Sequence, residues 1–299
     1  MKKELSYYET LKIIDETKKI FENQLEKRLG LIKVPCPLFV DSSSGLQDDL
    51  TGKEEAIHFK KDEYDYEIVH SLAKWKRFAL GKYHFSKDTG LYTNMKAIRK
   101  DEKVDSIHSI LVEQWDWEKV IDKEERTIDY LKTTVTQIYK AIRQTIIIIR
   151  KRYPFFSISL PKSIYFITSI ELEKRYPDET PKMREKLITK EKGAVFIIGI
   201  GDRHELRSPD YDDWKLNGDM LLYSKVLNRE IEITSMGIRV DEKSLMRQLK
   251  KTGCEEKSRL PYHQSILKRE LPYTIGGGIG ESRLLMYILG KKSISEVQG

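Results

Sequence analysis

A run of glycines close to the carboxyl end places the tightest limit on how this chain can fold. Residues 274–283 read Thr-Ile-Gly-Gly-Gly-Ile-Gly-Glu-Ser-Arg, which predicts a strand that leads into a helix beginning with a carboxylate and an arginine. A Walker phosphate loop is excluded because no Gly-Lys-Ser/Thr follows, and the early strand and ribose-binding acid of a dinucleotide site are missing. Taken alone, the run fits a ligand-binding turn and a tight structural turn equally well.

Two long helices are predicted from apolar residues that recur at three- and four-residue steps. The first covers about 22 residues and ends at Gly30, a residue type that commonly terminates helices. Residues 31–37 follow it as Leu-Ile-Lys-Val-Pro-Cys-Pro, and the two prolines favour an extended segment or an edge strand. The second helix is predicted within residues 118–153, where the apolar residues from Ile128 to Ile149 share one face.

The remaining apolar segments are short and predict strands. They are residues 56–59, 66–69, 91–98, 110–115, 194–200, 219–223 and 230–233, and further helices are predicted near 241–251 and 281–289. Most of these strands follow one another directly, which favours an antiparallel sheet over a doubly wound parallel one. The predicted fold class is therefore α+β, a mainly antiparallel sheet flanked by helices, with residues 1–299 forming a single domain.

Composition narrows the class of protein. The 54 Lys and Arg residues exceed the 47 Asp and Glu residues without forming a basic tail, which suits phosphate-bearing ligands better than nucleic acid. The longest apolar runs are far shorter than the ~20 residues that cross a bilayer, so a cytoplasmic protein without membrane contact is predicted. Cys36 and Cys254 form no Cys-x-x-Cys pair, which indicates neither a disulfide framework nor a thiolate zinc site.

Three segments in the correct chain order resemble the motifs of class II aminoacyl-tRNA synthetases. Residues 30–37 resemble motif 1, residues 96–102 resemble motif 2, and the glycine run resembles motif 3. The resemblance implies the catalytic-domain fold of that class. Residues 232–239 are similar to a strand of the aspartyl and asparaginyl members, in which a carboxylate and a hydroxyl three residues later reach ATP-bound magnesium. Glu232 and Ser235 occupy those two positions, and hard oxygen ligands suit Mg²⁺.

Residues 70–77, 113–118 and 207–214 resemble ammonia-dependent asparagine synthetases, the aspartate–ammonia ligases, and this resemblance spans nearly the whole chain. Taken singly, the tryptophans of these segments are better explained as core or sheet-face residues, and residues 210–213 as a solvated turn. The resemblance implies a ligase that makes L-asparagine from L-aspartate, ammonia and ATP through a β-aspartyl-adenylate, releasing AMP and pyrophosphate. ATP and Mg²⁺ are the expected cofactors.

Roles for individual residues follow from the same resemblance. The expected catalytic residues are Asp48, Arg99 and Arg283, with Asp48 orienting ammonium and accepting its proton. The expected substrate-binding residues are Lys76, Gln114, Asp116, Arg207, Asp212 and Arg239. The expected ATP-binding residues are Arg99, Asp219, Glu232, Ser235 and Arg283, of which Glu232 and Ser235 would hold the metal ion.

Two alternatives stay open at this point. An aspartyl- or asparaginyl-tRNA synthetase would form the same adenylate, but motif 1 begins near residue 30 and leaves no room for an anticodon-binding barrel before it, so tRNA is not an expected partner. A catalytically inactive paralogue could act as a binding module. Motif 1 builds the dimer interface in the resembled class, so a homodimer is predicted. Glu113 and Glu281 depart from the family, which often has aspartate and glutamine there.

Overall fold

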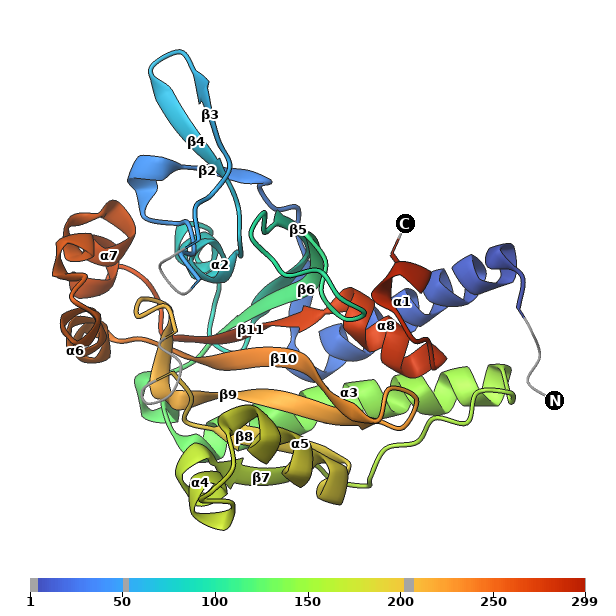
Figure 1. Ribbon diagram of the computed structural model, residues 1–299. Coiled ribbons are helices and arrows are strands. Elements are labelled where there is room, and N and C mark those ends of the chain that lie inside the picture. The colour runs from blue at the N-terminus through green and yellow to red at the C-terminus, as the bar shows by residue number, and fades with distance from the viewer. Residues whose placement is uncertain (1–4, 51–53, 202–206, 299) are drawn as a thin grey trace.

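A mixed eight-stranded sheet forms the centre of the computed structural model, which describes residues 5–50, 54–201 and 207–298 (Figure 1). Every pairing from β5 to β8 is antiparallel, and only the outermost pairs, β1 with β5 and β7 with β8, are parallel. This is the mainly antiparallel sheet that the sequence predicts. In spatial order the strands are β1 (Leu31–Lys33), β5 (Gly90–Ile98), β6 (Leu111–Val120), β11 (Thr274–Gly280), β10 (Arg229–Arg239), β9 (Asp212–Ser224), β8 (Ala194–Ile198) and β7 (Tyr165–Thr168).

The main apolar core lies between one face of this sheet and the helices α1 (Tyr7–Leu29), α3 (Ile128–Arg152) and α8 (Glu281–Leu289). α1 begins with a capping box formed by Ser6 and Glu9 and ends at Gly30, whose φ of +72° suits a residue without a Cβ atom. Trp115 and Trp117 of β6 are completely buried in this core. Because side chains alternate along a strand, residues 114, 116 and 118 of β6 face the other side of the sheet.

The remaining helices lie on that other side or at the ends of the sheet. Val195 and Ile197 of β8 pack under α4 (Ser169–Arg175) and α5 (Pro181–Lys192), whereas Phe196 faces the main core. α2 (Ala73–Lys82) packs on β6 and β11. α6 (Glu242–Thr252) and α7 (Pro261–Leu267) lie beside it at one end of the sheet (Figure 1). Single 3-10 turns occur at Ser42–Ser44, Lys123–Glu125, Glu255–Arg259 and Ile294–Glu296.

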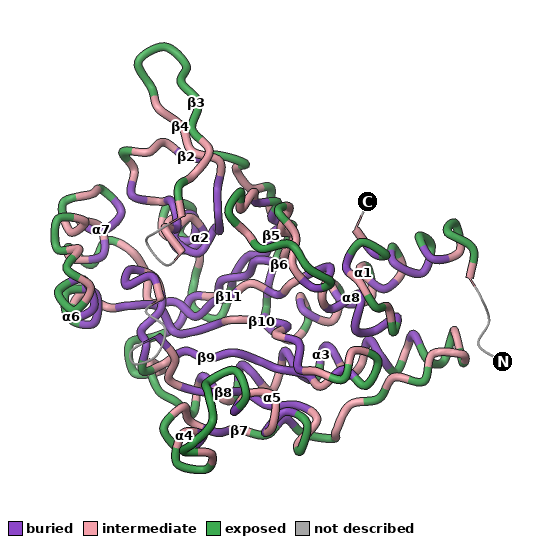
Figure 2. Tube along the Cα trace, in the orientation of Figure 1, coloured by how far each residue is buried: buried purple, intermediate pink, exposed green. Residues whose placement is uncertain are grey.

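A second sheet, of three strands, projects away from the central sheet (Figure 1). It consists of β2 (Phe39–Asp41), β4 (Tyr64–Ile68) and β3 (His58–Lys61), and its β3–β4 hairpin is the part of the molecule that extends furthest in Figure 1. Figure 2 shows this hairpin as mostly exposed, in contrast to the buried central strands. It therefore contributes little to the core that positions the site.

Most predicted elements are present, although several boundaries differ. The helix expected within residues 118–153 begins only at Ile128, because residues 118–120 finish β6 and Thr127 caps the helix. The strands predicted at 219–223 and 230–233 are parts of the longer strands β9 and β10. The helices α2, α4, α5 and α7 were not predicted from the sequence.

Cys36 and Cys254 are both free and only partly buried. Within the described parts of the chain, no helix combines the length and the apolar character that a bilayer crossing requires.

Candidate active site

A cavity of about 430 Å³ lies over the polar face of β6 and collects residues from distant parts of the chain. Its walls come from β6, β10 and β11, from the first turns of α2, and from the segment that leads into β9. All site residues expected from the sequence except Asp219 line it, namely Asp48, Lys76, Arg99, Gln114, Asp116, Arg207, Asp212, Glu232, Ser235, Arg239 and Arg283. The fold thus brings the expected residues into one place.

The glycine run forms β11 and makes room for the polar side chains of β6. Gly276 pairs with Glu118, and Gly278 pairs with Asp116, in an antiparallel register. A Cβ atom at Gly276 would lie 1.9 Å from Glu118 Oε2, and one at Gly278 would lie 2.2 Å from Gln114 Oε1. Real Cβ contacts are never this short, so the glycines are required by the side chains across the strand. The run serves a polar surface, which favours the ligand-binding interpretation over a purely structural turn.

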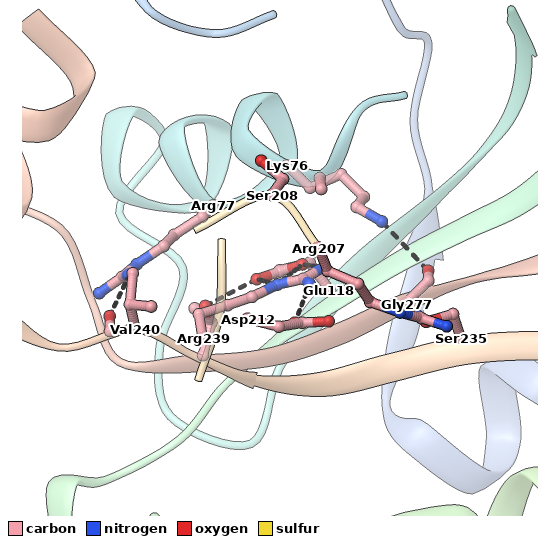
Figure 3. Close-up of polar contacts among 12 residues, drawn as sticks. Lys76, Arg77, Glu118, Arg207, Ser208, Asp212, Ser235, Arg239, Val240 and Gly277 are labelled. Atoms are coloured by element: carbon pink, nitrogen blue, oxygen red, sulfur yellow. Dashed lines mark hydrogen bonds and ion pairs between the residues drawn. The ribbon is translucent and has the colours of Figure 1, made fainter. Parts of the chain in front are cut away.

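Lys76 on α2 and Asp116 on β6 form a buried ion pair in the cavity wall. Lys76 Nζ lies 3.1 Å from Asp116 Oδ1 and donates a 3.1 Å hydrogen bond to the carbonyl oxygen of Gly277 (Figure 3). Burial lowers the pKa of Lys76, and Asp116 offsets only part of this effect. Asp116 Oδ2 is buried without a hydrogen-bond partner among the described residues. Since an unpartnered buried carboxylate oxygen is costly, this atom suits a cationic ligand group such as an ammonium.

Arg239, at the end of β10, is held by two buried carboxylates. Its Nε and Nη2 atoms donate to Glu118 Oε1 at 2.9 Å and to Oε2 at 2.6 Å, and Nη1 donates to Asp212 Oδ1 (Figure 3). Thr274 Oγ1 donates a further 2.7 Å hydrogen bond to Glu118 Oε1. Burial alone lowers the pKa of Arg239, but Glu118 and then Asp212 reverse this, so the pKa lies above its usual range. Arg239 is therefore a fixed cation in the cavity wall.

Arg207 connects the cavity to a carboxylate behind it. Its Nη1 atom donates to Ser235 Oγ at 2.7 Å and to Asp219 Oδ1 at 3.1 Å, and Nη2 donates to the second Asp219 oxygen. Asp219 thus lies behind the cavity and contacts its lining residues Arg207 and Ser235. Burial raises the pKa of Asp219 to about 7, because Arg207 offsets only part of the effect and the Glu232 carboxylate adds to it.

Glu232 and two arginines form the part of the cavity next to α8. Arg283 Nη1 lies 4.0 Å from Glu232 Oε1 and donates a 3.3 Å hydrogen bond to the Glu232 carbonyl oxygen. Arg99 follows β5 and lines the same region. Burial raises the pKa of Glu232, but nearby cations, Arg283 first among them, bring it below its usual range. A cluster of fixed cations around one ionised carboxylate suits a polyphosphate with a bound metal ion.

The donor atoms in this region are hard oxygens, from the carboxylate of Glu232 and the hydroxyl of Ser235. The described residues contain no group of three or more His, Cys, Asp or Glu side chains able to hold a metal ion on their own. Mg²⁺ is commonly bound by one or two carboxylates together with substrate phosphates and water. The donor set therefore fits Mg²⁺ that arrives with a nucleotide rather than a resident metal centre.

Asp48 also lines the cavity. It lies next to Ser71, which is two residues before the start of α2. Its Oδ2 atom accepts a 2.6 Å hydrogen bond from Ser71 Oγ, and Oδ1 accepts a 2.9 Å bond from the Leu50 amide. The side chain is buried although it lines the cavity. Two donors therefore fix the orientation of this carboxylate.

Several residues of the site were not identified from the sequence. Ser71 and Tyr211 line the cavity, while behind it Glu118 holds Arg239 and Thr274 donates to Glu118. Burial raises the pKa of Tyr211 well above its usual value, and the nearby Asp48 carboxylate adds to the effect. A signal for Glu118 was present, since it continues the alternation of Gln114 and Asp116 along β6.

The fold is that of the catalytic domain of class II aminoacyl-tRNA synthetases. The asparaginyl-tRNA synthetase of Pyrococcus horikoshii complexed with asparaginyl-adenylate superposes with a TM-score of 0.74 and 16% identity, over 97% of this chain and 68% of that chain. The asparaginyl-tRNA synthetase of Entamoeba histolytica gives a TM-score of 0.69 and 16% identity, over 98% of this chain and 66% of that chain. At this identity the similarity concerns the fold alone.

Sequence relatives identify the family within this class. The family model for aspartate–ammonia ligase matches residues 8–299. The aspartate–ammonia ligase of Clostridium perfringens is 55% identical over 303 residues, covering 98% of this chain and 90% of the relative. The ligases of Clostridium tetani and Bacillus cereus are 52% and 54% identical, over 99% and 97% of this chain and 90% and 91% of the relatives. The chain belongs to the aspartate–ammonia ligase family, so the resemblance inferred from its motifs is confirmed.

Proposed function

We propose that this chain makes L-asparagine from L-aspartate, ammonia and ATP through a β-aspartyl-adenylate. The observation that carries the proposal is the buried Lys76–Asp116 pair, in which one carboxylate oxygen has no partner among the described residues. An amino-acid substrate needs a cation for its carboxylate and an anion for its ammonium group. Both lie in one cavity with Arg99 and Arg283, which suit a triphosphate.

The chemistry requires activation of the β-carboxylate. Direct amidation would have to expel oxide, whereas attack of the carboxylate on the α-phosphorus of ATP releases pyrophosphate and gives a mixed anhydride with AMP as leaving group. Negative charge gathers at the α-phosphoryl group during that attack. We assign its stabilisation to Arg99 and Arg283, and loss of one such contact is expected to slow the reaction by roughly 10² to 10³.

Aspartate would bind beside the nucleotide. Lys76 is assigned to its side-chain carboxylate, and Asp116 with Gln114 is assigned to its ammonium group. Arg207, Asp212 and Arg239 are assigned to the substrate pocket, and Asp219 supports the nucleotide side through Arg207.

Ammonia must attack the anhydride as the neutral base. Asp48 is assigned to orient ammonium and accept its proton, because its carboxylate is fixed by Ser71 and lines the cavity. The expelled AMP carries away the oxygen through which the β-carboxylate was joined to phosphorus.

Magnesium is assigned to Glu232 and Ser235, with the remaining ligands supplied by phosphate and water. When bound, the ion neutralises phosphate charge and orients the triphosphate. Arg207 contacts Ser235 at 2.7 Å, so the proposal requires that hydroxyl to exchange this contact or to share its oxygen with the ion.

We further propose that the chain acts as a homodimer in the cytoplasm, as a single catalytic domain and without tRNA. The motif 1 region supports the dimer, since Ile32 of β1 and the nearby Leu38 are 57% and 51% exposed in the single chain.

The test is product formation from aspartate, ATP, Mg²⁺ and ammonium, with and without tRNA. Asparagine, AMP and pyrophosphate are expected in equal amounts without tRNA. Charging of tRNA without free asparagine would instead support a tRNA synthetase. No turnover by an intact, folded chain would support an inactive binding module.

A further inference from the structure

We propose that Glu118 is a positioning residue for aspartate, which holds the Arg239 guanidinium in one orientation while taking no direct part in binding. The proposal rests on the aspartate-binding role assigned to Arg239 above. Arg239 lines the cavity and Glu118 does not. Glu118 therefore contacts the ligand-binding surface through the guanidinium that it holds.

The contact between the two side chains is bidentate and dry. Glu118 Oε1 and Oε2 accept from Arg239 Nε and Nη2, and the two residues are 0% and 2% exposed. The planar guanidinium matches a carboxylate in this fork arrangement, which fixes its orientation as well as its position. Asp212 takes one Nη1 hydrogen. One N–H group on each Nη atom then remains for a ligand, since a guanidinium has five.

The Glu118 carboxylate is held in place by a hydroxyl, by a glycine and by the register of two strands. Thr274 donates to its Oε1 atom at 2.7 Å, and β11 leaves space for the carboxylate only because Gly276 has no Cβ atom. A Cβ there would also lie 2.7 Å from Arg239 Nη2. The strand register, Gly276 and the Thr274 hydroxyl thus all hold the Glu118–Arg239 pair in place.

Loss of the Glu118 charge is expected to weaken the binding of aspartate and to leave the binding of ATP unchanged. Glu118 contacts neither Arg99 nor Arg283 among its described hydrogen bonds and ion pairs, so the nucleotide side would keep its geometry. Without the Glu118 charge, the guanidinium would lose its charged bidentate partner and keep Asp212 and the Tyr211 ring, so it could shift about the Asp212 contact. Misplacing a binding group by about 1 Å can cost about 10²-fold.

Glu118→Gln tests this directly, because glutamine keeps the shape and removes the charge. Steady-state kinetics with each substrate varied in turn should show a KM for aspartate raised by roughly 10- to 100-fold and a KM for ATP within about twofold of wild type. Glu230→Gln is the matched control, since Glu230 is also buried and lies 3.8 Å from Lys182 and from Arg229, but does not line the cavity. It should lower the Tm without raising the KM for aspartate.

Thr274→Val is the second variant, for use if Glu118→Gln does not fold. It removes the hydroxyl that donates to Glu118. It should also raise the KM for aspartate, by a smaller factor than Glu118→Gln does. The proposal is overturned if a folded variant binds aspartate as wild type does, or if the KM values for aspartate and ATP rise together. If the wild-type chain makes no asparagine, the proposed function is refuted instead. Calorimetric binding of aspartate to wild type and to the variant then decides the role of Glu118.

Discussion

The Lys74 ammonium lies 2.6 Å from the Asp210 carboxylate, and both side chains are buried behind the cavity. His263 Nε2 lies 2.9 Å from the same carboxylate oxygen, and Ser208 Oγ donates to the other oxygen at 2.8 Å. Asp210 therefore ties α2 and α7 to the segment that leads into β9. This carboxylate therefore helps to hold α2, part of the cavity wall, against the segment that leads into β9.

Removal of the Asp210 charge should destabilise the protein strongly. Asp210→Asn leaves the Lys74 ammonium buried without a counter-ion, and breaking a buried pair in this way typically costs about 3–5 kcal/mol. Urea unfolding should show that loss. Asp15→Asn is the control, because Asp15 pairs with Lys19 on the exposed face of α1, where such pairs contribute about 0.3–0.5 kcal/mol. Equal losses for the two variants would contradict the structural role of Asp210.

Two alanine substitutions in the glycine run should differ sharply. In Gly278→Ala the new Cβ atom would meet Gln114 Oε1 at 2.2 Å and Asp116 Oδ1 at 2.7 Å, so asparagine formation should fall by about 10²-fold or more. In Gly280→Ala the closest atoms lie at 3.6 Å and φ is −61°, so the fold should accept the methyl group with a Tm close to wild type. A normal rate for Gly278→Ala, or a larger Tm loss for Gly280→Ala, would show that the described register is wrong.

The raised pKa of Asp219 predicts how stability changes with pH. The folded chain holds a proton on Asp219 up to about pH 7, whereas an unfolded aspartate loses it near pH 3.9. Between these values the folded state binds more protons, so this contribution to the free energy of unfolding decreases as pH rises towards 7 and is constant above it. Urea unfolding without nucleotide should therefore show wild type losing stability from pH 5 to pH 8 relative to Asp219→Asn. A relative gain over that range would contradict the raised pKa.

The motif 1 region should hold two chains together. Ile32 is 57% exposed on β1, next to the carboxyl end of α1, and burial of an apolar side chain of this size contributes about 1.5–3 kcal/mol. Sedimentation of wild type should give a dimer, and Ile32→Asp should shift it towards monomer. Val226→Asp alters an exposed residue between β9 and β10 and should leave the dimer intact. A monomeric wild type would refute the dimer.

Local patterns in the sequence predict the elements whose buried faces are apolar. α1 and α8 follow this rule, and both lie where the sequence places them. α2 breaks it, because its buried residues include Lys74, Lys76 and Arg77. A helix that turns its charged residues inward gives no apolar periodicity, so its existence depends on partners such as Asp116 and Asp210 that lie elsewhere in the chain.

The site was predicted through motifs, and this explains which residues received a role and which did not. Motif matching led to the cavity-lining residues, including Lys76 and Arg239. Glu118 and Asp210 lie inside matched segments but received no role, because they act on other side chains and their importance depends on strand register and on burial. Neither property can be read from one segment alone.

Transfer of an oxygen label tests the central claim of an aspartyl-adenylate. Aspartate with ¹⁸O in its β-carboxyl group is supplied with ATP, Mg²⁺ and ammonium, and the products are analysed by mass spectrometry. The account predicts one ¹⁸O atom in each AMP formed together with asparagine. Formation of ADP with the label in inorganic phosphate, or AMP without label, would contradict it.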